Sequence, residues 1–103
     1  MSTVIQGDTW TWVVVQDPGG DEHFLGQHDD VKDISYIPMF LEKEDALECL
    51  NLLTRDEKKK YEVQAIQYDQ LALDAAKHGF MLFVLNHAGE ILEKITPENP
   101  GRA

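Results

Sequence analysis

FMLFVL, residues 80–85, is the stretch of sequence that decides the fold. Its residues are apolar without alternation, which is typical of a β-strand that is buried on both faces. Two further strand-like apolar runs, 37–41 and 61–67, precede it, and they are followed by amphipathic stretches at 44–53 and 69–78. The middle of the chain therefore repeats a strand-then-helix unit twice and closes it with the strand at 80–85.

The two amphipathic stretches predict helices. Residues 44–53 have a broad apolar face, and Glu44 and Asp45 stand in the first turn, where the helix dipole favours acidic side chains. Residues 69–78 have a narrower stripe of leucine and alanine, and Gly79 predicts the helix end because glycine readily adopts the left-handed cap. Crossovers between parallel strands are right-handed, so the helices lie either on one face of the sheet or on opposite faces. The sequence leaves both layouts open.

Shorter strands flank this unit. Residues 9–15 are β-branched and aromatic and predict a strand. The sequence Asp-Pro-Gly-Gly-Asp at 17–21 predicts a tight turn, and 22–27 would be the returning strand of a hairpin. At the other end, Asn-His-Ala-Gly at 86–89 predicts a turn and 90–95 a last outer strand.

The predicted fold class is α/β, of mixed α+β type. We expect a polar loop at 28–33 and a strand at 34–41, in which Pro38 indicates an edge position, a bulge or a late start because it lacks a backbone donor. The whole is predicted as one domain, residues 1–95, with a single mixed β-sheet of five to six strands and two helices, in the order β-β-β-α-β-α-β-(β). Proline and glycine in 96–103 predict a flexible C-terminal tail.

Composition excludes some classes of partner. With 103 residues, of which 43% are hydrophobic, the chain is long enough for one core and apolar enough to fold. Its 19 acidic and 9 basic side chains give a net charge of -10, which argues against binding to nucleic acid or to an anionic membrane. The only basic run, Lys58-Lys59-Lys60, is flanked by acids and predicts a solvated segment.

The expected location is the cytoplasm. Residues 1–8 lack the pattern of a signal peptide, and the apolar run at 80–85 is too short to span a bilayer. The single cysteine, Cys49, excludes an internal disulfide and fits a reducing compartment. Its position in the first predicted helix indicates a packing role.

Potential ligand residues gather around the hairpin end and the acidic loop. Their chemistry suits a hard or borderline cation, although their spacing follows neither the His-Glu-x-x-His pattern nor a calcium-binding loop. The candidate metal ligands are His23, His28, Asp29 and Asp30. His87 is the candidate ligand-binding residue because strand ends in α/β sheets often border crevices. No nucleophile elbow or phosphate-binding glycine loop is present, so we predict no catalytic residue and no cofactor.

Aromatic side chains predict an interaction surface. A central strand that is apolar on both sides needs both faces covered, so a partner protein or a second copy of the chain is expected if both helices lie on one face. The candidate interface residues are Trp10, Trp12, Phe24 and Tyr36.

Two short motifs resemble the N-terminal domain of SseB-type proteins. One is Ile-Pro-Met-Phe-Leu at 37–41, which is followed by the acidic helix start at 44–46, and the other is Asn-His-Ala-Gly at 86–89. The family has Asn-Pro-Gly-Gly at the second motif, so this chain departs from it at His87 and Ala88. The resemblance implies a small accessory or regulatory domain without catalytic activity. The order of strands and helices is also similar to that of small bacterial domains of unknown function.

The sequence thus predicts a small acidic domain that acts as a non-enzymatic protein-interaction or accessory module, with a partner protein or as a homodimer. The alternative is a protein that binds a small molecule or a divalent metal, an enzyme included. Its site would lie near His87 and the acidic loop at 28–33.

Overall fold

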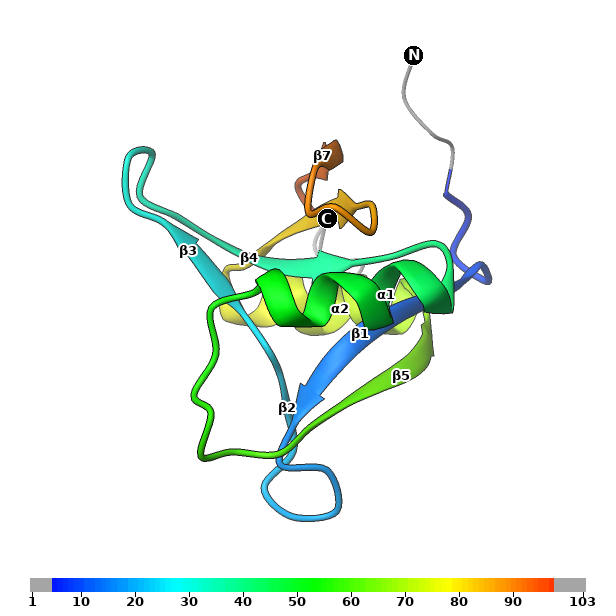
Figure 1. Ribbon diagram of the computed structural model, residues 1–103. Helices are drawn as coiled ribbons and strands as arrows, with labels where there is room; N and C mark the ends of the chain where they lie inside the picture. The colour runs from blue at the N-terminus through cyan, green and yellow to red at the C-terminus, as the bar shows by residue number, and fades with distance from the viewer. Residues whose placement is uncertain (1–4, 98–103) are drawn as a thin grey trace.

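The computed structural model of the chain describes residues 5–97 and contains two β-sheets and two α-helices (Figure 1). The strands are β1 (Trp10–Gln16), β2 (His23–Phe24), β3 (Gln27–Asp29), β4 (Ile34–Met39), β5 (Tyr61–Gln67), β6 (Met81–Leu85) and β7 (Ile91–Ile95). The helices are α1 (Lys43–Cys49), which continues into a 3-10 turn at Leu50–Leu52, and α2 (Tyr68–His78). The predicted α/β fold class, of mixed α+β type, and the two helices are confirmed. The structure has seven strands in place of the predicted five to six, because two short strands, β2 and β3, stand where one strand at 22–27 was predicted.

The prediction of a single sheet is wrong, because the strands divide into two sheets. One has three antiparallel strands in the order β2-β1-β5, and the other has four in the order β3-β4-β6-β7, of which β4 and β6 are parallel. The division occurs inside the predicted return strand at 22–27, since only His23 and Phe24 pair with β1. At Gly26 a side chain would meet the Phe80 ring at 3.2 Å, so glycine permits the close approach at which the chain changes sheet.

The two sheets are joined at one point. Trp12 in β1 and Phe40, just after β4, exchange two backbone hydrogen bonds of 2.8 and 2.9 Å. The backbone groups of Phe40 therefore face β1, and those of Pro38, two residues earlier, face the same side. On this edge of β4, β3 pairs only as far as Tyr36 and β1 pairs only at Phe40. Pro38 lies between these two partners, where no backbone N–H is needed for pairing.

The repeated strand-then-helix unit does not form two successive parallel crossovers. β5 pairs with β1 in the three-stranded sheet, and only β4 and β6 are parallel neighbours. The two helices lie on opposite faces of β6, because α2 contributes Leu71 and Ala75 to the cluster on one face and α1 contributes Ala46 and Cys49 to the cluster on the other. Helices therefore cover both faces of β6, and no partner is needed to cover either one.

Element boundaries differ from the predicted ones in the first helix and in the loop at 28–33. The predicted helix at 44–53 starts at Lys43 and leaves α-helical geometry after Cys49. Part of the predicted loop at 28–33 is strand, because β3 forms a hairpin with β4. α2 ends as predicted, with Gly79 at φ 75°. The predicted tail at 96–103 lies outside the described residues from 98 onward.

Within residues 5–97, neither helix combines the length and the apolar character that crossing a membrane requires.

Candidate functional site

A groove of about 640 Å³, hereafter the α2 groove, lies between α2 and the three-stranded sheet. Its apolar lining consists of Val13, Val15, Phe24, Ile37, Ala65, Ile66 and Phe80. Its polar rim consists of Glu22, His23, Gln64, Gln70, Asp74 and His78. This volume lies within the range of pockets that bind small molecules or single side chains of a partner protein.

Side-chain periodicity explains why these residues meet. In β1 every second residue points to the same face, so Val13 and Val15 both face α2. On α2 the polar rim residues are four positions apart, which places Gln70, Asp74 and His78 on one side of the helix. Leu71 and Ala75 are fully buried and hold the helix against the core. α2 therefore presents a polar wall beside the apolar lining.

Local hydrogen bonds fix several rim side chains. His23 contacts the Asp21 carbonyl through Nδ1 at 3.1 Å and the Gln16 amide nitrogen through Nε2 at 2.9 Å. If Nδ1 carries the proton and donates to the carbonyl, Nε2 is free to accept from the amide. The backbone N–H of Gly19 donates to the Glu22 carboxylate at 2.7 Å.

The charge of the groove is one-sided. Glu22 and Asp74 contribute carboxylates, and among the described residues that line the groove there is neither lysine nor arginine. His78, which lies 3.7 Å from the Asp74 carboxylate, also contacts the carbonyl oxygen of that residue at 2.9 Å. The rim therefore favours a ligand that carries positive charge next to an apolar group.

The four predicted interface residues do not form one patch. Phe24 lines the α2 groove, whereas Trp12 and Tyr36 pack against the cluster under α1. The Lys43 ammonium lies over the Trp12 ring, 5.6 Å from its centre. Trp10, at the start of β1, is 59% exposed. As interface residues all four remain predictions.

The face of the four-stranded sheet that lies toward α1 carries a small stack of side chains. The rings of Tyr36 and Phe83 are parallel within 14° and 4.1 Å apart, and the Lys94 ammonium lies 5.3 Å from the centre of the Phe83 ring. Burial, followed by the nearby Asp29 charge, raises the pKa of the Tyr36 hydroxyl. Contact with Lys32 lowers the pKa of Lys94.

The structure does not bring the four predicted metal ligands together. His23 lies on the rim of the α2 groove. His28 is 3.7 Å from Asp30 and 3.2 Å from Asp33, in the hairpin between β3 and β4. The Asp29 carboxylate accepts hydrogen bonds from the backbone N–H groups of Val31 and Lys32, so it stabilises its own turn.

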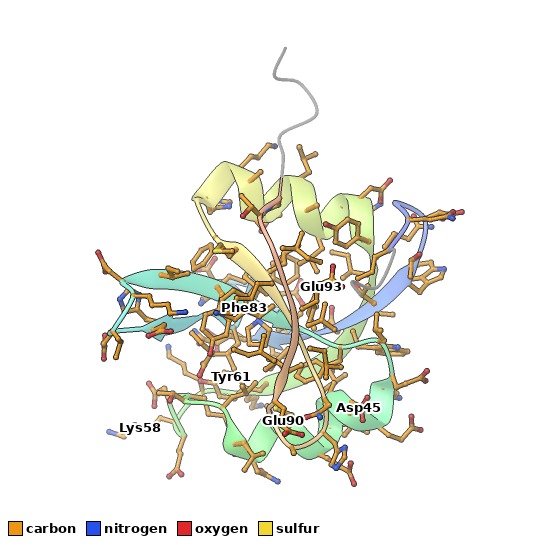
Figure 2. All side chains as sticks on the ribbon, turned by 90° about the horizontal axis from the view of Figure 1, so that it is seen from above. Asp45, Lys58, Tyr61, Phe83, Glu90 and Glu93 are labelled. Carbon is orange, nitrogen blue, oxygen red and sulfur yellow. The ribbon has the colours of Figure 1, made fainter. Side chains whose placement is uncertain are left out.

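The neighbour of His87 is α1 and not the acidic loop at 28–33 beside which its site was predicted. It lies in the turn between β6 and β7, and its Nδ1 is 3.8 Å from the Asp45 carboxylate on α1. One ligand atom each from Asp45, Glu48 and His87 lie within 4.8 Å of one another, which is the set among the described residues that could hold a metal ion. Figure 2 shows Asp45 of α1 close to the turn that carries Glu90, away from the β3–β4 hairpin.

Comparisons of the chain with protein-family models, with curated proteins and with solved structures find no match. The resemblance to the SseB N-terminal domain therefore stays a prediction. Sequence reasoning singled out only Phe24 and His23 among the residues of the α2 groove. The sequence does carry a signal for the part of the groove that α2 forms. On this helix three polar residues are four positions apart, Gln70, Asp74 and His78, and they alternate with the buried Leu71 and Ala75.

Proposed function

We propose that the protein is a non-enzymatic interaction module whose working surface is the α2 groove. The observation that carries this proposal is an open groove with an apolar lining and an acidic rim that no lysine or arginine among its described lining residues neutralises. Such a site supports binding of a partner protein through an aliphatic or aromatic side chain that enters the groove.

Charge complementarity defines the chemistry of the partner segment. Glu22 and Asp74 would face lysine or arginine residues on either side of the inserted apolar side chain. The net charge of -10 adds a long-range attraction for basic segments. The SseB-like motifs point to the same class, an accessory domain without catalysis. The proposal keeps the cytoplasmic location that the sequence predicts.

Site-specific photo-crosslinking tests this function. A photoreactive phenylalanine analogue replaces the exposed Gln70 on the groove rim, and a control protein carries it at the exposed Glu44 on α1. In the native cell we expect the Gln70 position alone to crosslink, to a segment in which lysine or arginine flanks an apolar residue. An acidic crosslinked segment, equal yield from both positions, or a bound metabolite in native mass spectrometry instead of a protein would contradict the proposal.

Charge reversal provides a second measurement. Asp74→Lys and Glu22→Lys should each lower the crosslinking yield by about 3- to 10-fold, because each replaces an attraction by a repulsion at the rim. Glu57→Lys changes the net charge equally but lies outside the groove lining, so it should preserve the yield.

A second candidate function is binding of a divalent cation at Asp45, Glu48 and His87. The observation that favours it is the convergence of two carboxylates from one helix and an imidazole from a distant turn. We expect Zn²⁺ to raise the Tm of the protein and the variant His87→Ala to lose this rise, because a ligand of the folded state stabilises it. The variant His28→Ala should retain the rise. An unchanged Tm with Zn²⁺, Mn²⁺ and Mg²⁺ would exclude this function.

A further inference from the structure

β5 is an edge strand with one unpaired side. It pairs with β1 over its whole length, from Tyr61 opposite Gln16 to Gln67 opposite Trp10. No other strand of the described chain pairs with β5. Its second edge therefore presents backbone groups without a strand partner.

The pairing with β1 shows which groups face outward. Backbone hydrogen bonds join Asp17 to Lys60 and Tyr68 to Thr9, at the two ends of the ladder. Along an antiparallel strand, every second residue forms its backbone hydrogen bonds with the same neighbouring strand. Because Lys60 and Tyr68 bond to the β1 side, the even-numbered residues of β5 between them also bond to β1. The N–H and C=O groups of Tyr61, Val63 and Ala65 consequently point away from β1.

The sequence of this strand lacks the usual protection against edge pairing. Tyr61–Gln67 contains neither proline, glycine nor lysine, which are residues that commonly blunt an edge. Its one charged residue, Glu62, accepts a hydrogen bond from the Gln64 side chain at 2.9 Å. The edge is long, regular and suited to pairing with another strand.

We propose that a second copy of the chain pairs with β5, antiparallel and about a twofold axis at Gln64. The ends of the strand carry opposite charges, because exposed Lys58, Lys59 and Lys60 precede it and exposed Asp69 follows it. An antiparallel copy brings the lysines that precede β5 in one copy to the end of β5 that carries Asp69 in the other. Gln64 is the middle residue of the seven-residue strand, so an axis there lets every residue of β5 pair, from Tyr61 opposite Gln67 onward. An axis at Val63 would instead set Ile66 and Gln67 opposite residues that lie outside β5.

This arrangement extends the three-stranded sheet through both copies. Directly opposed residues of an antiparallel pair point to the same face, so the α2 grooves of the two copies open on the same side. The proposal does not depend on what the groove binds. Variants of the groove acids, such as Asp74→Lys, should leave the self-association unchanged.

A proline substitution tests the strand pairing. Ala65→Pro removes an N–H group that faces outward, so it should disrupt the dimer without removing a bond to β1. The control Ala65→Thr keeps the N–H and favours strand geometry. In sedimentation equilibrium we expect dimers for the wild type and Ala65→Thr, and a monomer with an unchanged circular dichroism spectrum for Ala65→Pro. A monomeric wild type, or a dimeric Ala65→Pro, would overturn the proposal.

Disulfide crosslinking tests the position of the axis independently. Two Gln64 residues across the axis would form a non-hydrogen-bonded pair with Cα atoms about 4.5 Å apart, within reach of a disulfide. Gln64→Cys should therefore oxidise to a covalent dimer, while Glu62→Cys, displaced from the axis, should not. The natural Cys49 is fully buried and does not interfere. A dimer that crosslinks through Glu62→Cys, and not through Gln64→Cys, would refute this register.

Discussion

At the scale of single residues, Gly79 shows how one backbone conformation ends a helix and starts a strand. Its φ of 75° lies in the left-handed region, and its N–H donates to the carbonyl groups at the end of α2. The next N–H, of Phe80, donates to the Ala75 carbonyl at 2.9 Å. The chain can therefore turn directly from α2 into β6.

We expect Gly79→Ala to lower the free energy of unfolding by about 1 kcal/mol. No atom lies within 4 Å of a Cβ at this position, so the whole effect comes from the backbone conformation. Gly20→Ala is the matched control, because Gly20 has no positive φ and its added Cβ would make only an ordinary contact at 3.6 Å. Urea denaturation of both variants measures the difference, and equal losses would contradict the prediction.

Cys49 is a buried thiol whose protonated form is favoured in the folded protein. Burial, followed by the charge of Asp45, raises the pKa of its thiol. The unfolded chain therefore loses this proton at a lower pH than the folded chain. Below the ordinary thiol pKa the fold has its full stability, and as pH rises through that value toward the raised pKa the stability falls.

Stability measurements between about pH 7 and pH 10 should show this loss, beginning near pH 8.5. In Cys49→Ala the thiol is absent, so the decline in the free energy of unfolding should begin only where the tyrosines titrate, at about pH 10. Burial also raises the pKa values of Tyr36 and Tyr68 and makes the later decline common to both proteins. Parallel stability curves for the two proteins over this range would disprove the assignment.

At the scale of elements, α2 joins the two sheets because small residues let it approach closely. Ala75 is fully buried among Leu71, Leu82 and Val84 in the cluster below the helix. Cα–Cβ directions on a helix place Ala76 on a different side, where it is only partly buried.

Ala75→Leu should destabilise the protein by about 1–3 kcal/mol, because the added atoms have no space in a packed core. Ala76→Leu adds the same atoms at a partly exposed site and should cost less than about 0.5 kcal/mol. Thermal unfolding of the two variants distinguishes these cases. A tolerant Ala75 site would mean that α2 packs less tightly than the cluster indicates.

The elements themselves were predictable because their signals are local. The apolar run at 80–85, the helix end at Gly79 and the turns at 17–21 and 86–89 depend on neighbours in sequence. The division into two sheets was not predictable, because it depends on contacts between distant residues. The approach of Gly26 to Phe80 and the bridge from Trp12 to Phe40 leave no periodic pattern in the sequence.

The candidate site was less accessible to sequence reasoning for the same reason. Its apolar lining combines residues of both sheets, such as Val13 and Ile37, and its wall comes from α2. His87, in the turn after β6, was predicted from the sequence as a ligand-binding residue, but its neighbours Asp45 and Glu48 come from a helix that precedes it by two strands. Only the packing of the elements decides such pairings.

At the scale of the whole molecule, the net charge of -10 opposes folding through self-repulsion. The pair that lysine makes within residues 5–97, Lys59 with Asp17, spans 3.9 Å between partly exposed groups and offsets little of this repulsion. Screening by salt should therefore stabilise this protein.

Raising NaCl from about 0.05 M to 0.5 M should increase the Tm by a few degrees, roughly 1 kcal/mol in free energy. The double variant Glu44→Lys with Glu57→Lys reduces the net negative charge by four units at exposed sites and should show a smaller increase. KCl should act like NaCl, since the effect is one of ionic strength. A Tm that falls with salt would show that attractive pairs dominate.

The alternation of the chain between its sheets has a kinetic consequence. β1 and β2 belong to one sheet and β3 and β4 to the other, after which β5 returns to the first and β6 and β7 to the second. Each sheet closes through residues far apart in the sequence, such as Gln16 with Tyr61 and Met39 with Val84. Loop-closure entropy must be lost before these contacts form, so we expect folding in milliseconds to seconds, in a transition state that already engages both sheets.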